Sequence, residues 1–212
     1  MLNDDPEGGA PRALPLVLRV EKRDPPSHEA LCEAAATAVV LLLASGEFEE
    51  AVRLWEDGRI RKVTRRARGA RWRDAERPPG VTVAHAGAEV RAYPPCPIED
   101  LPPELAKMQV AGTDLEPGPT KEPGAPYCAL VLNADAKMTT GKAAAQAGHA
   151  AHLLYRGLPA ESRDAWLAAG APAHIVDVPW AEAVARAAVT IRDAGFTEVA
   201  PGTLTAVAWL ID

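Results

Sequence analysis

Three polar side chains repeat along one alanine-rich segment and could carry chemistry. In KMTTGKAAAQAGHAAHLL, residues 137–154, Gln146 and His149 follow Lys142 at i+4 and i+7. On a helix this spacing places an ammonium, an amide and an imidazole on one face, while the alanines between them can pack inward. Such a stripe could bind an anionic group and position water beside it.

The lysine stands where a helix disfavours a cation. Thr139 or Thr140 is a suitable N-cap and Gly141 permits the turn, so Lys142 falls in the first helical turn. The N–H groups and macrodipole there amount to about half a positive charge, which disfavours a cation by a few tenths to about 1 kcal/mol. We therefore expect an anion nearby: a phosphate, a carboxylate or a transition-state oxyanion.

The elements around this helix predict where a partner could come from. An apolar strand at 129–133 precedes the helix, predicted over 142–155, and a β-branched run predicts another strand at 189–193. Helices of α/β folds begin beyond the carboxyl ends of their strands, where ligands gather. If the two strands run parallel, Asp193 reaches Lys142, and Thr197 offers a hydroxyl from the next loop.

The rest of this region continues the alternation of helices and strands. Helices are predicted at 160–169 and 181–187 and a strand at 174–178. Pro201-Gly202 fits the centre of a type II turn.

The first part of the chain repeats the pattern. LPLVLRVEKRDPPSHEALCEAAATAVVLL, from Leu14, aligns without gaps on CALVLNADAKMTTGKAAAQAGHAAHLLYR, from Cys128, and Trp55 and Trp166 take matching places later. This similarity suggests an internal duplication, although two unrelated α/β units could share the same order of strands and helices.

Composition sets the domain limits and excludes some classes. Nine of the 20 prolines lie in 94–126, which predicts a linker between an α/β domain at 13–93 and another at 127–212, after a flexible tail at 1–12. The three cysteines form no CxxC pair, so neither zinc nor a disulfide framework is expected, and the cytoplasm is the expected location. The longest apolar run, 34–44, is shorter than the roughly 20 residues of a membrane span, so it predicts a buried helix.

A basic run interrupts an acidic protein. The net charge is −6, yet RIRKVTRRARGARWRDAER, residues 59–77, holds nine basic residues. Arg65, Arg66 and Arg68 are candidates for contact with a polyanion, and Trp72 could stack on a base. A solvated face and a core tryptophan are the alternatives.

At this point a family resemblance emerges. KMTTGKAAAQAGHAA with IRDAGFTEVAPGTLTAVA resembles the type II peptidyl-tRNA hydrolases, the archaeal and eukaryotic kind, over residues 128–212. The resemblance implies a mixed four-stranded α/β fold, frequent dimers, and hydrolysis of the peptidyl-tRNA ester without metal or cofactor. The family's functional residues fall on these positions: catalytic Lys142, Gln146, Asp193 and Thr197, with Asp135 and His149 matching its pattern.

Departures from the family pattern affect the expected contacts with tRNA. Thr139-Thr140 replaces a glycine and a lysine, and Phe196 replaces an arginine, so two cations are missing. Lys137 remains as a candidate tRNA contact, and the basic run could replace the lost charge.

The first copy departs further. His28 and Cys32 stand at the places of Lys142 and Gln146, and Asp74 is aligned with Asp193. We predict that this copy is inactive and could replace the second subunit of a dimer.

These observations predict an α/β protein of two tandem small units, each with a mixed, roughly four-stranded sheet and flanking helices. The expected function is ester hydrolysis on peptidyl-tRNA, by a monomer with an internal pseudo-dimer or by a homodimer, without contact with a membrane. In the expected mechanism Asp193 orients or deprotonates water, Thr197 and Gln146 position it or the carbonyl, and Lys142 with the helix start stabilises negative charge.

Purely structural roles for these residues remain as alternatives. Lys142 could be a surface lysine, Asp193 a turn former and Gln146 a surface residue, while His149 with His152 is weak support for a metal. A non-catalytic tandem module that binds RNA or protein is the alternative function.

Overall fold

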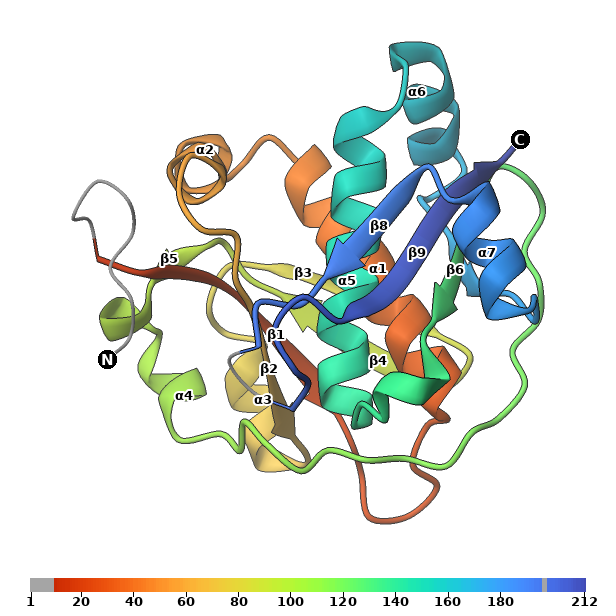
Figure 1. The fold of residues 1–212 in the computed structure, drawn as a ribbon. Coiled ribbons are helices and arrows are strands. Elements are labelled where there is room, and N and C mark those ends of the chain that lie inside the picture. Colours follow the sequence, from red (N-terminus) through yellow and green to blue (C-terminus); the bar gives the residue numbers. More distant parts are fainter. Residues whose placement is uncertain (1–9, 196–197) are drawn as a thin grey trace.

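Two β-sheets enclose a central pair of helices. The computed structural model describes residues 10–195 and 198–212. Helices α1 and α5 lie side by side in the middle, one sheet covers each side of the pair, and further helices cover the outer faces (Figure 1). The protein is therefore layered, with its largest core between the two sheets.

The first unit is built from the N-terminal half of the chain. Its strands are β1 (Arg12–Arg19), β2 (Lys62–Ala67), β3 (Val81–His85), β4 (Ala88–Ala92) and β5 (Cys96–Pro97). Its helices are α1 (His28–Ala44), α2 (Glu49–Glu56) and α3 (Ala70–Ala75). The apolar run at 34–44 lies within buried α1, as predicted.

The second unit follows the predicted order of elements. Its strands are β6 (Tyr127–Leu132), β7 (Ala173–Ile175), β8 (Val189–Arg192) and β9 (Leu204–Ile211). Its helices are the short 3-10 helix η2 (Ala134–Ala136), α5 (Thr140–Gly157), α6 (Ala160–Ala168) and α7 (Trp180–Arg186). The predicted central helix was two residues short at each end, and β7 stops at residue 175 rather than 178.

The two sheets have the same topology. The strand order is β2-β1-β4-β3 in the first sheet and β7-β6-β9-β8 in the second. In the first sheet β5 also pairs with one end of β1. In each, the first strand pairs in parallel with the strand after the helices and antiparallel with the last strand of a terminal hairpin. The prediction of two tandem α/β units with mixed sheets is confirmed.

Two tryptophans mark equivalent places in the units. Trp55 and Trp166 are both fully buried, and each indole N–H donates to the carbonyl of the residue before the edge strand. The acceptors are Arg61 O at 3.1 Å and Pro172 O at 2.9 Å. The sequence match therefore extends to a shared hydrogen bond, whereas common descent of the units stays a prediction.

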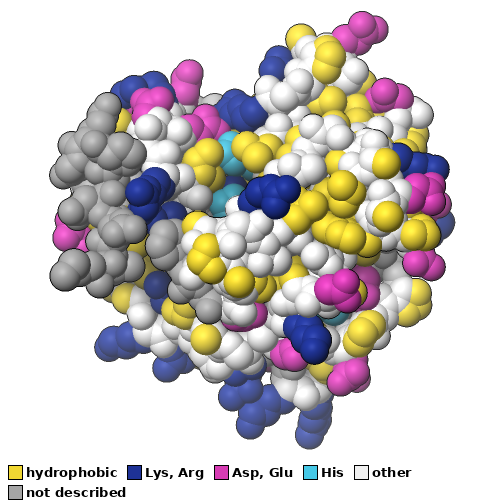
Figure 2. Space-filling model, in the orientation of Figure 1, with side chains coloured by type: hydrophobic (Ala, Val, Ile, Leu, Met, Phe, Trp, Pro, Cys, Tyr) yellow, Lys and Arg dark blue, Asp and Glu magenta, His cyan; other side chains and the backbone are white. Residues whose placement is uncertain are grey.

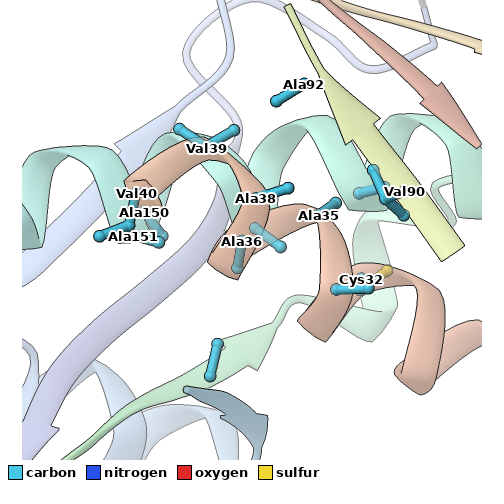
Figure 3. Packing of buried hydrophobic residues seen from close by; sticks show 14 of the residues in the cluster. Cys32, Ala35, Ala36, Ala38, Val39, Val40, Val90, Ala92, Ala150 and Ala151 are labelled. Atoms are coloured by element: carbon cyan, nitrogen blue, oxygen red, sulfur yellow. The ribbon is translucent and has the colours of Figure 1, made fainter. Parts of the chain in front are cut away.

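Small side chains let the central helices approach closely. Most of α1 is buried, and its alanines pack near those of α5, as Figure 3 shows for Ala36, Ala150 and Ala151. At Gly148 on α5 a Cβ atom would lie 3.1 Å from Val39 Cγ2 of α1 and 3.4 Å from Lys62 Cδ of β2. The helix contact therefore depends on side chains of minimal size.

The outer face of each sheet has its own smaller core. Helix α3 and the short helix α4 (Pro103–Ala106) pack on the first sheet through a cluster that contains Trp72 and Tyr93. Helix α7 packs on the second sheet around Trp209.

The segment between the units, residues 98–126, lies against both central helices. It contains η1 (Ile98–Asp100) and α4. Beyond α4, Glu116 O accepts the N–H of His28, the first residue of α1, at 3.0 Å, and Thr113 O accepts the N–H of Gly141 in α5 at 2.9 Å. We call residues 98–126 the connecting segment.

Among the described residues, no single helix combines the length and apolar character needed to cross a bilayer; α1 and α2 meet that test only together, bent by 111°.

The close contact at Gly148 gives a stability prediction. We expect Gly148→Leu to lower the free energy of unfolding by about 1–3 kcal/mol, because the larger side chain must displace Val39 or the Lys62 stem. Gly157→Leu is the matched control, since a Cβ there meets nothing within 4 Å. Urea denaturation of both variants measures the difference, and equal stabilities would contradict the proposed constraint.

Candidate active site

Lys142 and Asp193 meet at one edge of the second sheet. Strands β8 and β6 run parallel to each other because both are antiparallel to β9, so Asp193 emerges where α5 begins. The Lys142 ammonium forms an ion pair with Asp193 Oδ2. The two side chains are 13% and 8% exposed, so the pair is largely withdrawn from solvent yet still accessible.

Gln146 orients the carboxylate from the next turn of α5. Its Nε2 donates to Asp193 Oδ2 at 2.8 Å, and its Oε1 accepts from Thr205 Oγ1 at 2.9 Å. Gln146 is 3% exposed, so it is neither a surface residue nor a ready water ligand. Sequence reasoning did not single out Thr205; the available signal was one buried hydroxyl in the otherwise apolar interior of β9.

The loop after β8 fixes Asp193 through its backbone. The Asp193 N–H donates to Thr203 O at 2.9 Å, and its carbonyl accepts from Gly202 N at 2.7 Å. Its Oδ1 accepts from Gly195 N at 2.8 Å. Gly195 has φ +80°, and a Cβ there would lie 2.4 Å from Pro201 Cγ, so a glycine is required. The Pro201-Gly202 turn is present as predicted, with Gly202 at φ +80°.

The start of α5 is not an open anion site. Thr139 is the N-cap and accepts from Lys142 N at 3.4 Å, while Thr113 O and Asp114 Oδ1 take the N–H groups of Gly141 and Thr140. The expectation that these N–H groups help hold substrate charge is therefore wrong, because the cap and the connecting segment already occupy them. Of the expected anions, the structure places a carboxylate, Asp193, beside Lys142.

A second polar cluster lies one turn further along α5. Lys62 of β2 is 8% exposed, and its Nζ lies 3.2 Å from His149 Nδ1 and 3.1 Å from His152 Nδ1. The ammonium also lies 4.7 Å from the centre of the Trp55 ring, on which His152 stacks. The two histidines therefore bind a lysine of the other unit, and no group of His, Cys, Asp or Glu within the described ranges could hold a metal ion.

Burial sets the protonation of this cluster. Desolvation and the charge of Lys62 lower the pKa of His152 to about 4, although Glu56 Oε1, at 2.7 Å from Nε2, favours the charged form. Burial, then Lys62, His152 and Lys142, hold the pKa of His149 well below its usual value. Burial also lowers the pKa of Lys62. Both imidazoles are therefore neutral at pH 7.

Histidine side chains reach the surface to different extents. Figure 2 shows histidine atoms at the bottom of a hollow, between the elements labelled α2 and β8 in Figure 1. His149 is half-buried, whereas His152 is 1% exposed.

Lys137 and Asp135 lie apart from the ion pair. Lys137 is exposed, in a left-handed conformation after η2, and it lines a cavity of about 320 Å³ at the carboxyl ends of β6 and β7 together with His28 and Asn133. Asp135 is exposed, and its backbone N–H donates to Asn133 Oδ1 in this turn. Its contribution to the turn therefore comes from the backbone rather than from the carboxylate. The structure therefore does not bring these two residues to the Lys142–Asp193 pair.

The basic run divides between the two faces of the first sheet. Arg65 is half-buried and donates to Met108 O at 3.4 Å, and Arg66 pairs with Gln109, while Arg68 is exposed. Trp72 is 3% exposed within the core under α3, so it cannot stack on a base without unpacking.

The first unit lacks the ion pair. His28 contacts Thr140 Oγ1 at 3.0 Å, and burial raises the pKa of the Cys32 thiol. Asp74 is wrongly matched to Asp193, because it lies in α3, before the strand equivalent to β8, and pairs with Arg77. Strand register instead shows that His85 takes the place in the first unit that Asp193 has in the second.

The match of His85 to Asp193 follows from the pairing of neighbouring strands. In the first unit, Leu16 of β1 pairs with Ala92 of β4, and Ala92 pairs with Val81 of β3. Val81 stands four residues before His85. In the second unit the corresponding partners are Leu130, Ala208 and Val189, and Val189 stands four residues before Asp193. His85 binds Glu33 Oε2 at 2.6 Å, so the first unit holds no lysine and carboxylate at these places.

Thr197, the remaining catalytic candidate, and Phe196 lie outside the described residues.

The buried histidine predicts a pH dependence of stability. His152 has its ordinary pKa near 6.5 when unfolded and about 4 when folded, so between these values only the unfolded chain takes up its proton. The free energy of unfolding therefore falls as pH is lowered through this window, by at most about 1.4 kcal/mol per pH unit from this group. Urea denaturation at pH 7 and pH 5 should show a smaller fall in His152→Gln, and parallel falls in both proteins would contradict the assignment.

The comparisons with known proteins concern the second unit. No solved structure matches the chain. A family model described as peptidyl-tRNA hydrolase PTH2 matches residues 127–210, from the start of β6 nearly to the end of β9. The part of the chain that carries Lys142, Gln146 and Asp193 is thus similar to the type II peptidyl-tRNA hydrolases.

Proposed function

We propose that the chain hydrolyses the ester bond between peptide and tRNA in peptidyl-tRNA. The observation that carries this proposal is the Lys142–Asp193 ion pair, held by Gln146 within the range that matches the hydrolase family. The first unit has a histidine at both corresponding places, so we assign the reaction to the second unit.

The reaction adds water to the ester carbonyl and then breaks the bond to the ribose oxygen. Water oxygen attacks the carbonyl carbon, and the carbonyl oxygen becomes an oxyanion. Collapse of this intermediate breaks the ester bond, and the ribose oxygen takes the proton that the water lost. The peptide leaves as its acid, which gives the remaining proton of the water to solvent and becomes a carboxylate. The protein must therefore orient one water and stabilise one negative oxygen.

Asp193 is suited to orienting the water. Its Oδ2 faces Lys142 and Gln146, and its Oδ1 accepts from Gly195 N, so the carboxylate cannot rotate freely. We therefore assign this carboxylate to orienting the water rather than to removing its proton. Thr205 supports this arrangement indirectly by holding the Gln146 amide.

Lys142 is suited to stabilising the oxyanion. An ammonium has three N–H donors, so Lys142 can contact Asp193 and still direct a donor to a developing charge when substrate binds. Because the backbone N–H groups at the start of α5 are occupied, this task falls to the lysine side chain.

A release assay tests the proposal. Purified protein with N-blocked aminoacyl-tRNA should release the blocked amino acid, and Lys142→Ala should lower turnover by about 10² or more because an oxyanion donor is lost. Lys121→Ala, which changes an exposed lysine of the connecting segment, should leave turnover unchanged. The same assay with a chelator tests metal independence.

Two results of this assay would contradict the proposal. Absence of release at high protein concentration would contradict the hydrolase function. Near-wild-type turnover of Lys142→Ala would remove this lysine from the mechanism.

The exposed arginines of the first unit are the proposed contacts for the tRNA backbone. Arg68 follows β2, and six residues of extended chain, about 20 Å, separate it from Lys62 near the site. A tRNA with its end at Asp193 can cover that distance.

Substitution of Arg68 tests this contact. Arg68→Ala should raise KM, leave kcat unchanged, and reduce by about one the slope of log affinity against log salt concentration. Arg186→Ala on α7, at the outer face of the other sheet, is the control. Equal salt slopes for wild type and Arg68→Ala would exclude this contact.

A further inference from the structure

Lys62 is a residue of the first unit that lies against the site of the second. It comes from edge strand β2, and its side chain runs along α5 past Gly148, where a Cβ would lie 3.4 Å from Lys62 Cδ. Its ammonium ends between His149 and His152, at 3.2 and 3.1 Å. Only 8% of the residue is exposed.

Packing alone does not explain a lysine at this place. Burying an amine is unfavourable, and an apolar side chain of similar volume would fill the same space with equal or better stability. The lysine instead supplies hydrogen-bond donors at a point where two imidazoles converge. Its effect must therefore be sought in the histidines.

Those donors select one tautomer of each ring. Lys62 Nζ carries at least two hydrogens, whether charged or neutral, so it can donate one to each Nδ1 that faces it. When it does so, each Nδ1 is unprotonated and each Nε2 carries the hydrogen of its ring. On His152 this agrees with the second contact, because its Nε2 lies 2.7 Å from Glu56 Oε1, which also accepts from Arg156 Nε at 2.9 Å. The hydrogen of His152 is thus already used within the protein.

His149 differs from His152 in this respect. Within residues 10–195 and 198–212, Lys62 is the hydrogen-bond partner found for its ring, and the residue keeps partial exposure. His149 lies three residues after Gln146 and seven after Lys142, on the same face of α5. A ring that accepts at Nδ1 from Lys62 therefore carries its Nε2–H on the edge away from Lys62, on the face of α5 that also carries Gln146 and Lys142.

We propose that Lys62 is a positioning residue of the active site, which holds His149 as the tautomer whose Nε2–H donates to a substrate oxygen next to the scissile ester. This role rests on the proposed hydrolase function. It makes the first unit a structural part of the site, although that unit lacks the ion pair.

Nitrogen NMR of the histidine side chains tests the positioning without any substrate. In the wild-type protein at pH 7 we expect the His149 ring to be almost entirely in the Nε2–H form. Lys62→Met should give a mixture of the two tautomers, whereas the control Lys121→Met should match the wild type. An unchanged His149 tautomer in a folded Lys62→Met protein would overturn the proposal.

Kinetics on N-blocked aminoacyl-tRNA test the consequence. We expect Lys62→Met and His149→Ala each to lower kcat by about 10-fold or more, because a misplaced donor fails in the transition state, with KM changed by less than about twofold. The double variant should be no slower than the slower single variant, because both changes remove one interaction. Multiplicative losses, or wild-type kcat in Lys62→Met, would overturn the role of Lys62.

Two further outcomes separate the causes of failure. If Lys62→Met does not fold, Lys62→Gln, which keeps N–H donors, takes its place, and retention of the Nε2–H tautomer with higher kcat than His149→Ala supports the proposal. An inactive wild-type protein would overturn the hydrolase function, whereas an active wild type with an unaffected Lys62 variant would overturn only the positioning role.

Discussion

The close approach of α1 and α5 is the constraint on which the rest of the protein depends. Both helices are rich in alanine, and at Gly148 there is no room for a larger side chain between α5 and its neighbours Val39 and Lys62. This contact joins the inner faces of two sheets into one continuous core. It also brings edge strand β2 of the first unit within reach of the polar face of α5, so that packing and chemistry meet on one helix.

The lysine at the start of α5 is explained by its neighbours rather than by an exposed ligand site. The N-cap Thr139 and the connecting segment take the first N–H groups, and Asp193 supplies the negative charge that Lys142 requires. The cationic side chain is thus kept at a helix start that would otherwise disfavour it, beside a carboxylate held by Gln146. Ionic pairing, helix capping and strand direction must all agree for this arrangement to form.

Much of the architecture could be predicted because it follows from local patterns. The alternation of apolar strands and alanine-rich helices gave the two units, and parallel direction of β6 and β8 brought Lys142 to Asp193. The match of Asp74 to Asp193 was wrong, since sequence similarity alone does not reveal strand register. Lys62 could not be foreseen as part of the site, because its position depends on contact between residues 87 apart in the chain.

The connecting segment makes the association of the two units independent of protein concentration. In a dimer, two subunits find each other by diffusion and separate on dilution, so their stability depends on concentration. Here both halves belong to one chain, and the tether between them also bonds to each central helix, which keeps their local concentration high at any dilution. The halves are not required to be identical, so one can provide support while the other carries the reactive groups.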